Sequence, residues 1–311
     1  MIANTDPVIL LAGPTASGKT ALSVGLARSL NGEIINADSM QVYRDLRILS
    51  ARPDEGEQGG IPHHLFGVLD ASERASVGWW ADAAMDCIDN IRSRGKRPIL
   101  VGGTGLYFSA LVKGLAAMPE ISARTRQSVE DIAAQGLEAL REQAMACDPA
   151  ATARIKPADR QRMMRVVEIG LETGKAISDY QADTHPLLAP DDWIGLVIEP
   201  ERAALYARIE QRFDRMLDEG ALGEVAALAE RGLDPVLPAM KALGVPPLLA
   251  VHAGQLDLAE AVHQAKQDSR RYAKRQLTWL RNQMPDWQRL PCPDGKVSLA
   301  DVISQLDRSV G

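Results

Sequence analysis

The chain has 311 residues, of which 46% are hydrophobic and 24% charged, and its formal net charge is −6. This composition excludes a disordered or fibrous protein, and the length allows one large or two smaller domains. The negative net charge gives no general attraction for nucleic acid, so such a partner needs a local basic patch.

Neither a membrane span nor a signal peptide is expected. No apolar run approaches the roughly 18 residues that a membrane span needs, and the N-terminal pattern is not that of a signal peptide. The three cysteines are far apart and lack the spacing of metal ligands, which suits reduced thiols. We therefore expect a soluble cytoplasmic protein.

A glycine-rich turn at residues 13–20 directly follows the apolar run from Val8 to Ala12. Its glycines let backbone amides turn toward phosphoryl oxygens, and Lys19 adds a positive charge. The hydroxyl of Thr20 is placed to ligate Mg²⁺ at the start of a helix. The pattern predicts a phosphate-binding loop, without saying which reaction it serves. Its members are Gly13, Pro14, Thr15, Ala16, Ser17, Gly18, Lys19 and Thr20.

Further apolar runs of strand length alternate with helical patterns, which favours a parallel sheet covered by helices. The predicted fold class is α/β, with a P-loop parallel sheet flanked by helices and a helical insert domain. The predicted strands are residues 8–12, 33–37, 99–101 and 193–198, and the predicted helices of this part are residues 76–94, 202–219, 221–231, 256–284 and 298–309.

Strand-like runs disappear between about Leu115 and Pro190. Residues 129–147 and 160–173 instead show the periodicity of amphipathic helices. We therefore predict a discontinuous catalytic core, made of residues 1–115 and 190–311, and a helical insert domain at residues 116–189.

Two polar segments follow predicted strands, at the sheet edge where open α/β sheets bind ligands. Asp38 follows the second strand and could be a magnesium-associated carboxylate or a general base. The glycine turn at residues 102–105 carries Thr104 and could let a ligand approach the backbone, or could be a tight strand-to-helix turn. The residues alone leave both questions open.

Basic residues gather in two helical segments. Residues 154–165 hold five basic residues against one acidic residue, and residues 266–281 hold six against one. Such segments could follow a phosphate backbone, although a basic helix face is often only solvated.

Six motifs, in order along nearly the whole chain, are GPTASGKT at 13–20, NADSMQVYR at 36–44, GIPHHL at 60–65, GGTGLYF at 102–108, DRQRMMR at 159–165 and AKRQLTWLR at 273–281. Together they make the chain resemble the tRNA dimethylallyltransferase family, also called tRNA isopentenyltransferases. The resemblance implies transfer of the dimethylallyl group of dimethylallyl diphosphate to N6 of adenosine 37, in tRNAs that read codons starting with U. A small-molecule or nucleotide kinase is the alternative, because the same kind of loop binds ATP.

The resemblance also implies roles for particular residues. Asp38 would accept the N6 proton, Thr104 and Arg126 would line the channel in which adenine and diphosphate meet, and Arg212 would add charge at the diphosphate. The expected cofactor is Mg²⁺, and the expected partner is the tRNA anticodon stem-loop. We expect a monomer without an obligate protein partner. The implied tRNA contacts are Asp38, Ser39, Met40, Gln41, Gln161, Arg162, Met163, Met164, Arg165, Lys274, Arg275 and Arg281.

One segment departs from the family pattern. Where the family commonly has Gly-Tyr-Arg-Gln, this chain has Gly-Val-Pro-Pro at residues 244–247. A tyrosine, a cation and an amide are therefore absent from a loop expected to face RNA, and no tRNA contact is assigned there.

Overall fold

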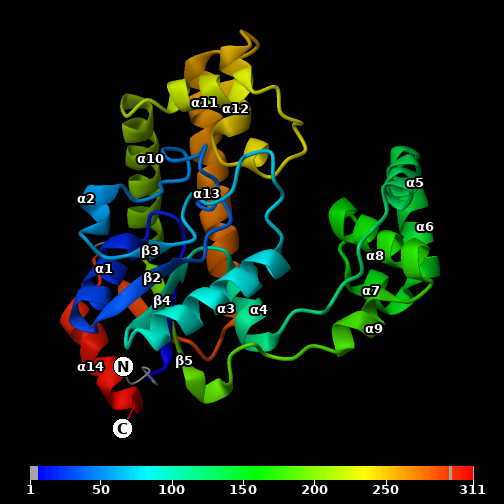
Figure 1. The fold of residues 1–311 in the computed structure, drawn as a ribbon. Coiled ribbons are helices and arrows are strands. Elements are labelled where there is room, and N and C mark those ends of the chain that lie inside the picture. Colours follow the sequence, from blue (N-terminus) through cyan, green and yellow to red (C-terminus); the bar gives the residue numbers. More distant parts are fainter. Residues whose placement is uncertain (1–5, 294–295, 311) are drawn as a thin grey trace. The chain divides into compact units, whose positions relative to one another are not determined.

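The computed structural model describes residues 6–293 and 296–310 (Figure 1). Within these residues the strands form one six-stranded parallel sheet in the order β3-β2-β4-β1-β5-β6. The predicted α/β class with a parallel sheet is confirmed. The strands are β1 (Val8–Ala12), β2 (Gly32–Asn36), β3 (His63–His64), β4 (Arg97–Gly102), β5 (Trp193–Pro200) and β6 (Gln288–Cys292).

The two edge strands, β3 and β6, have no counterpart among the predicted strands. β3 has only two residues, which is too short for a periodic signal. β6 has the sequence Gln-Arg-Leu-Pro-Cys, which lacks a continuous apolar run, and it is a strand because Leu196 to Pro200 of β5 pair with it. Edge strands tolerate polar residues and proline, so their pattern is weak.

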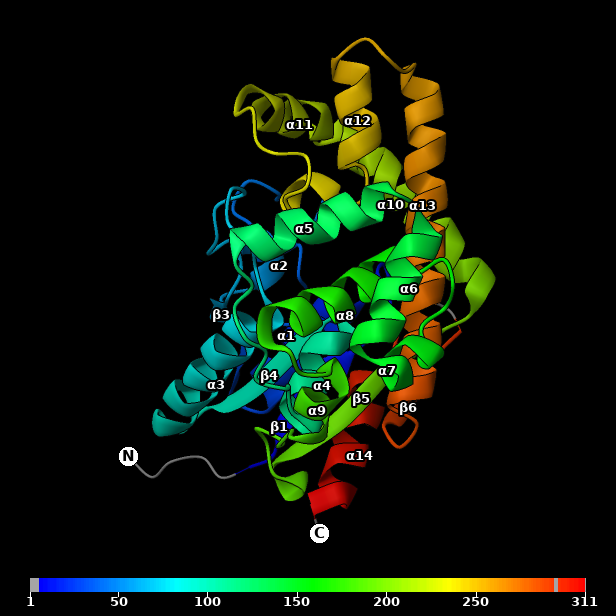
Figure 2. The same ribbon diagram turned by 90° about the vertical axis from the view of Figure 1, so that its right-hand side faces the viewer.

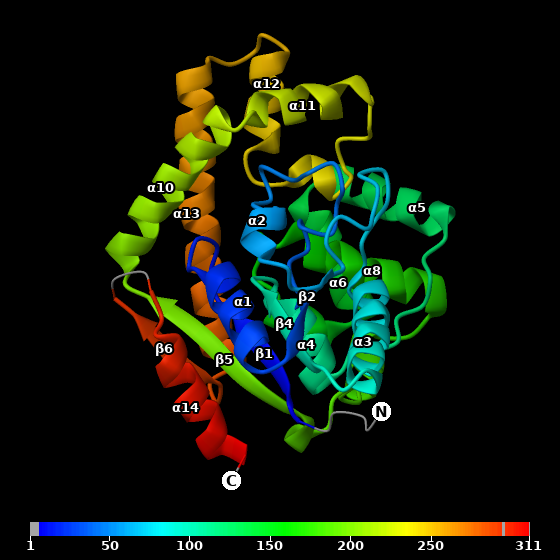
Figure 3. The same ribbon diagram turned by 60° about the vertical axis from the view of Figure 1, so that its left-hand side comes forward.

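Alternate residues of β1 face the two sides of the sheet. Val8, Leu10 and Ala12 belong to one buried cluster, and Ile9 and Leu11 belong to another, with all five side chains fully buried. Burial on both faces is typical of a parallel sheet between helical layers. The first cluster includes residues of α3 (Val77–Ser93) and α4 (Gly105–Lys113), and the second includes residues of α1 (Lys19–Ser29), which lies in front of the sheet in Figure 3, and of α14 (Leu299–Val310).

Two long helices extend beyond the sheet and lie side by side in Figures 1 and 3. They are α10 (Arg202–Asp218) and the 26-residue α13 (Leu258–Gln283), which contact each other. The helices predicted near residues 202–219 and 256–284 are therefore confirmed. The remaining helices of this part are α2 (Glu55–Gln58), α11 (Ala221–Glu230) and α12 (Val245–His252), with short 3₁₀ turns at Pro190–Asp192 and Ala239–Lys241.

The chain divides into two compact units. One runs to Val112 and resumes at Leu188, and the other is Lys113–Leu187. The second unit is helical and has a core of its own, which includes Val129, Leu140 and Met163. Its helices, labelled in Figure 2, are α5 (Ala123–Ala134), α6 (Leu137–Cys147), α7 (Pro149–Arg154), α8 (Arg160–Thr173) and α9 (Ile177–Ala182).

The single helix predicted at residues 129–147 is wrong. Gly136, with φ 120°, separates α5 from α6 in a backbone conformation that an α-helix does not allow. No helix in the described part of the chain combines the length and apolar character needed to cross a bilayer.

Replacing Gly102 by alanine tests how tightly β4 packs on the segment after β2. A β-carbon on Gly102 would lie 1.9 Å from the carbonyl oxygen of Ala37, so the backbone must shift. We expect Gly102→Ala to lower the free energy of unfolding by about 1–3 kcal/mol, measured by denaturant titration. Gly223→Ala is the matched control, because no atom lies within 4 Å of its added β-carbon and the residue is in α11. The control should be neutral or stabilising by up to about 1 kcal/mol, and equal losses in both variants would contradict the packing argument.

Candidate active site

The phosphate-binding loop connects β1 to α1. Gly18 precedes the helix with φ 86°, and Ala16 also has a positive φ of 60°. The first amides of α1 have no acceptor within the helix and, with the helix dipole, favour an anion at this end. The Lys19 ammonium donates hydrogen bonds to the carbonyl oxygens of Gly13, at 3.0 Å, and Pro14, at 2.7 Å. The loop therefore already has the shape of an anion site.

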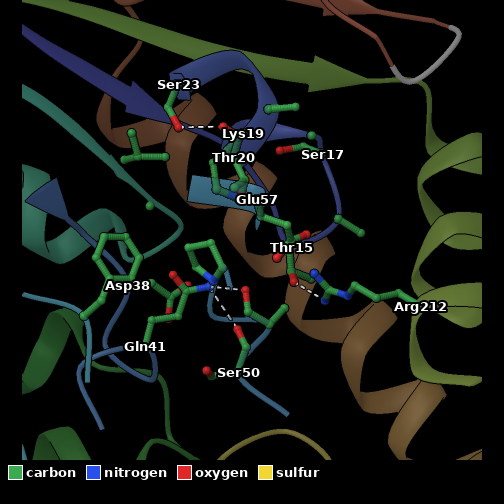
Figure 4. Close-up of a pocket in the computed structure, with 18 of the residues that line it drawn as sticks. Thr15, Ser17, Lys19, Thr20, Ser23, Asp38, Gln41, Ser50, Glu57 and Arg212 are labelled. Atoms are coloured by element: carbon green, nitrogen blue, oxygen red, sulfur yellow. Dashed lines mark hydrogen bonds between the residues drawn. The ribbon is translucent and has the colours of Figure 1, made fainter. Parts of the chain in front are cut away.

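A cavity of about 410 Å³ opens against this loop. In Figure 4, Lys19, Thr20, Asp38, Gln41 and Arg212 surround it. The cavity thus joins the loop to the segment after β2 and to α10. Its other charged or polar lining residues include Thr15, Ser17, Ser50, Glu57, His63, Arg208, Gln211 and Arg215.

Positive charge outweighs negative charge among the side chains that α10 and the loop bring to this cavity. Burial lowers the pKa of Lys19 to about 8 and the pKa of Arg212 to about 10, while the charge of Asp38 acts to raise both. Ser17 Oγ and Arg208 Nη2 are buried and have no hydrogen-bond partner among the residues that the structure describes. Desolvated cations and unpaired polar atoms are what a bound anion stabilises.

Asp38 is held rigidly at the end of β2. Its backbone N–H donates to the Asn36 side-chain oxygen at 2.8 Å, and Asn36 Nδ2 donates to the Asp38 carbonyl oxygen at 3.0 Å. Asp38 Oδ1 accepts from the N–H of Met40 at 2.9 Å. Among the described residues no donor is bonded to its other carboxylate oxygen, Oδ2. One oxygen therefore orients the carboxylate, and the second is available to a ligand.

A second cavity of about 240 Å³ shares Thr15, Asp38, Ser50 and Arg212 with the first. Asp38 thus lies where the cavity beside the phosphate-binding loop meets a cavity with aromatic and apolar walls. The other walls of the second cavity include Ser39, Met40, Phe213, Met216, Lys241, Tyr272 and Arg275.

Thr104 is bonded to the segment that carries Asp38. Its Oγ1 accepts from the N–H of Ser39 at 3.0 Å and donates to Ser39 Oγ at 3.3 Å, and it also forms a hydrogen bond with the Tyr272 side chain. Burial, reinforced by the nearby charge of Asp38, raises the pKa of the Tyr272 hydroxyl. This phenol therefore stays protonated at neutral pH beside the carboxylate.

The glycines of the turn at 102–105 allow close packing of other parts of this protein, at positions where a ligand could also have approached. Added β-carbons would lie 1.9 Å from the Ala37 carbonyl oxygen at Gly102, 2.2 Å from Gln276 Nε2 at Gly103, and 2.1 Å from the Trp279 ring at Gly105. Of the two interpretations left open by the residues, the structure favours the tightly packed turn.

Two family models match the chain: "IPP transferase" over residues 41–283 and "isopentenyl transferase" over residues 7–63. A tRNA dimethylallyltransferase of Maricaulis maris is 55% identical over 98% of this chain and 99% of its own length. One of Hyphomonas neptunium is 47% identical over 93% of this chain and 92% of its own. The chain belongs to the tRNA dimethylallyltransferase family.

Solved structures of family members share this fold. The tRNA isopentenylpyrophosphate transferase of Bacillus halodurans aligns with a TM-score of 0.71 at 35% identity, over 98% of this chain and 95% of its own. A eukaryotic dimethylallyltransferase described as acting on tRNA aligns with a TM-score of 0.84 at 28% identity, over 98% of this chain and 79% of its own. The resemblance stated from the six motifs is thereby confirmed.

The remaining residues implied by the family pattern lie partly in the helical unit. Arg126 is exposed on α5, and Gln161 and Arg162 are exposed on α8. Met163 is 0% exposed in the core of that unit, so its implied contact with tRNA is corrected. Its side chain serves folding, because it faces the other helices of the unit. Of the same motif, Met164 and Arg165 are half-buried.

The charge of the basic segment in α13 is smaller than its sequence predicts. Lys266 pairs with Asp214 at 2.6 Å, Arg270 with Glu210, Arg271 with Asp268 at 3.3 Å and Arg281 with Glu199 at 3.2 Å. Among the described residues, Lys274 and Arg275 have no carboxylate partner, and the Arg275 guanidinium lies 5.6 Å from the centre of the Tyr272 ring. Unneutralised basic charge on α13 is therefore concentrated in these two exposed residues.

The segment 244–247 is buried where it begins, at Val245. Val245, where the family commonly has tyrosine, is fully buried, and a β-carbon on Gly244 would lie 3.0 Å from the Phe213 ring. The Val245 side chain starts α12 on the core side, in line with the sequence analysis, which assigned no tRNA contact there.

Sequence reasoning missed Arg208, Arg215, Tyr272 and Gln276 as site residues. On α10, Arg208, Arg212 and Arg215 follow helical spacing, so one face of the helix presents three cations to the cavity. The sequence shows this spacing, but it does not show that this face of α10 points toward the cavity. Gln276 carried no signal beyond being a polar residue among the buried positions of α13.

The pKa of Lys19 predicts a pH dependence of anion binding. Only the ammonium form attracts inorganic diphosphate, so binding raises the pKa of Lys19 and takes up a proton. We expect the dissociation constant to increase by up to about tenfold per pH unit above pH 8. Calorimetry in buffers of different ionisation heat measures the proton uptake.

Lys19→Met is the control for that measurement. The neutral side chain should bind diphosphate more weakly at pH 7, and it should lack the proton uptake of Lys19. Equal uptake in both proteins would assign the effect to diphosphate itself and contradict the prediction.

Proposed function

We propose that the protein transfers the dimethylallyl group of dimethylallyl diphosphate to N6 of adenosine 37, in tRNAs that read codons starting with U, and releases diphosphate. The observation that carries the proposal is the position of Asp38, between an anion-binding cavity and a second cavity with aromatic walls. A transferase of this class needs a general base close to the site that binds the diphosphate leaving group. The names of its relatives support the same reaction.

The phosphate-binding loop would hold the diphosphate. Amides at the start of α1, the Lys19 ammonium and the Arg212 guanidinium face the cavity and would stabilise the negative charge that grows on the leaving oxygen. The hydroxyl oxygens of Thr20 and Ser17 line the cavity and suit Mg²⁺ or a phosphoryl group as ligands. Bound Mg²⁺ would supply Lewis-acid stabilisation of the diphosphate.

Asp38 would act as the general base. The N6 lone pair attacks the allylic carbon, the carbon–oxygen bond to diphosphate breaks, and its electron pair leaves with the diphosphate. The proton lost from N6 passes to Asp38 Oδ2, the oxygen without a protein donor. Adenine N6 is a weak nucleophile, so alignment of N6 with the allylic carbon supplies much of the rate.

The nucleic-acid partner in this proposal is the tRNA anticodon stem-loop. Adenosine 37 must leave the stacked loop to reach Asp38, as bases do for other enzymes that modify them. Ser39, Met40 and Gln41 lie beside Asp38, and Gln41 Nε2 is fixed by the carbonyl oxygens of Ser50 and Ala51 at 3.0 and 2.9 Å. We extend the proposal to backbone contacts by Lys274, Arg275 and Arg281 on α13, by Gln161, Arg162, Met164 and Arg165 on α8, and to Arg126 as a channel residue.

The proposal places this chemistry in the cytoplasm, in a monomer that needs no second protein. The helical unit of residues 113–187 is proposed as a part of the protein that contacts tRNA. Its exposed Arg162 supports that contact, although an ion pair with Asp159 at 3.4 Å reduces its charge.

Incubation with undermodified tRNA, labelled dimethylallyl diphosphate and Mg²⁺, followed by nucleoside analysis, tests the function. We expect N6-prenyladenosine at position 37 and release of diphosphate, with no requirement for ATP. Consumption of the γ-phosphate of ATP without prenylation would support the kinase alternative and refute the proposal.

Replacing Asp38 by asparagine tests the base directly. The asparagine oxygen can still accept from Met40, so the segment keeps its shape while the base is lost. We expect turnover to fall by about 10²-fold or more, with tRNA affinity retained. Single-turnover kinetics and a binding titration measure the two quantities, and near-normal turnover would exclude this role.

Arg275→Ala tests the proposed contact of α13 with the phosphate backbone of tRNA. Removing one phosphate contact should weaken tRNA binding and reduce the slope of log affinity against log salt concentration by about 0.7–0.9. Arg271→Ala is the control on the same helix, because Asp268 already pairs with that guanidinium. A slope that is unchanged in Arg275→Ala, or that changes equally in both variants, would contradict the contact.

A further inference from the structure

Gln276 is a buried amide on α13 that contacts two of the loops around the candidate active site. Its side chain is 6% exposed. Oε1 accepts a hydrogen bond from the backbone N–H of Thr15 at 2.9 Å, and Nε2 donates one to the carbonyl oxygen of Gly103 at 2.9 Å. These bonds join residues that are 261 and 173 positions apart. One side chain thus ties the phosphate-binding loop to the turn at residues 102–105.

The hydrogen bond at Thr15 has two consequences for an anion in the cavity. The Thr15 N–H is used by Gln276, which leaves the later amides of the loop to the anion. The Thr15 hydroxyl, placed by the same backbone, accepts a hydrogen bond from Arg212 Nη2. Gln276 therefore acts on the cation that lines the cavity through one intermediate residue.

Gly103 packs closely against the side-chain amide of Gln276. A β-carbon at Gly103 would lie 2.2 Å from Gln276 Nε2 and 3.3 Å from the carbonyl oxygen of Gly13. A side chain at residue 103 would displace the Gln276 amide and crowd the phosphate-binding loop. An apolar side chain of equal length in place of Gln276 would remove the partner of the buried Gly103 carbonyl oxygen and of the half-buried Thr15 N–H.

We infer that Gln276 is a positioning residue of the diphosphate site, which orients the phosphate-binding loop and, through Thr15, the guanidinium of Arg212. The inference rests on the proposed function, in which this site holds the diphosphate of the prenyl donor. Lys274 and Arg275 directly precede Gln276 in α13 and are exposed. The helix proposed to grip tRNA is thus the helix that shapes the diphosphate site.

Gln276→Met tests the inference, because methionine keeps the length of the side chain and removes both hydrogen bonds. Binding of inorganic diphosphate with Mg²⁺ is measured by calorimetry, tRNA binding by titration, and folding by thermal denaturation. We expect diphosphate affinity to fall by about tenfold or more. The KM for dimethylallyl diphosphate should increase to a similar extent, while tRNA affinity is unchanged.

Gln276→Glu is a second variant with a different signature. Its carboxylate can accept from Thr15 but places negative charge near the anion and faces the Gly103 carbonyl oxygen. Diphosphate binding should be weakest at high pH and should recover as the carboxyl group is protonated and becomes a donor. The unmodified protein and Gln276→Met should share only the pH dependence of Lys19, so a further recovery below pH 8 that is confined to Gln276→Glu separates positioning from general stability.

Gln264→Met is the matched control, since Gln264 is exposed on the same helix and bonds only Glu260 among the described residues. It should bind diphosphate as the unmodified protein does. A lower melting temperature of Gln276→Met with unchanged diphosphate affinity would overturn the inference. Failure of the unmodified protein to bind diphosphate would instead overturn the diphosphate site of the proposed function.

Discussion

The structure depends on the concentration of positive charge around a single loop. Lys19 and Arg212 both have lowered pKa values because they are withdrawn from water, and the charge of Asp38 acts in the opposite direction. Such an arrangement is unfavourable in the empty protein and favourable when an anion enters. Much of the surrounding fold serves to keep these groups in place, including the Gly13 and Pro14 carbonyl oxygens that hold the ammonium.

The parallel sheet explains why these groups meet. The carboxyl ends of β1, β2 and β4 carry the phosphate-binding loop, Asp38 and the turn at residues 102–105, and neighbouring parallel strands end at the same edge. Alignment in the sheet is not sufficient by itself. Glycines at 102, 103 and 105 remove side chains where Ala37, Gln276 and Trp279 approach, so the three segments can be packed against each other and against α13.

Two ion pairs join the long helices α10 and α13. Lys266 and Arg270 of α13 pair with Asp214 and Glu210 of α10, which cancels charge that the sequence suggests is available to RNA. Both helices also contact the phosphate-binding loop. Arg212 of α10 and Gln276 of α13 each form a hydrogen bond with Thr15. Burial in a cavity makes such hydrogen bonds more valuable than they would be on the surface.

The sequence by itself determined the phosphate-binding loop, the carboxylate at the end of the second strand, the α/β class and the family. Each of these depends on spacing over a few residues or on motifs read in order, and local chain geometry carries that information. Only the tertiary structure decided that Met163 is buried, that four of the six basic residues at 266–281 of α13 are paired, and that Gln276 joins the loop to the glycine turn. These features arise between residues up to 261 positions apart, where packing of whole helices sets which side chains meet and which charges cancel.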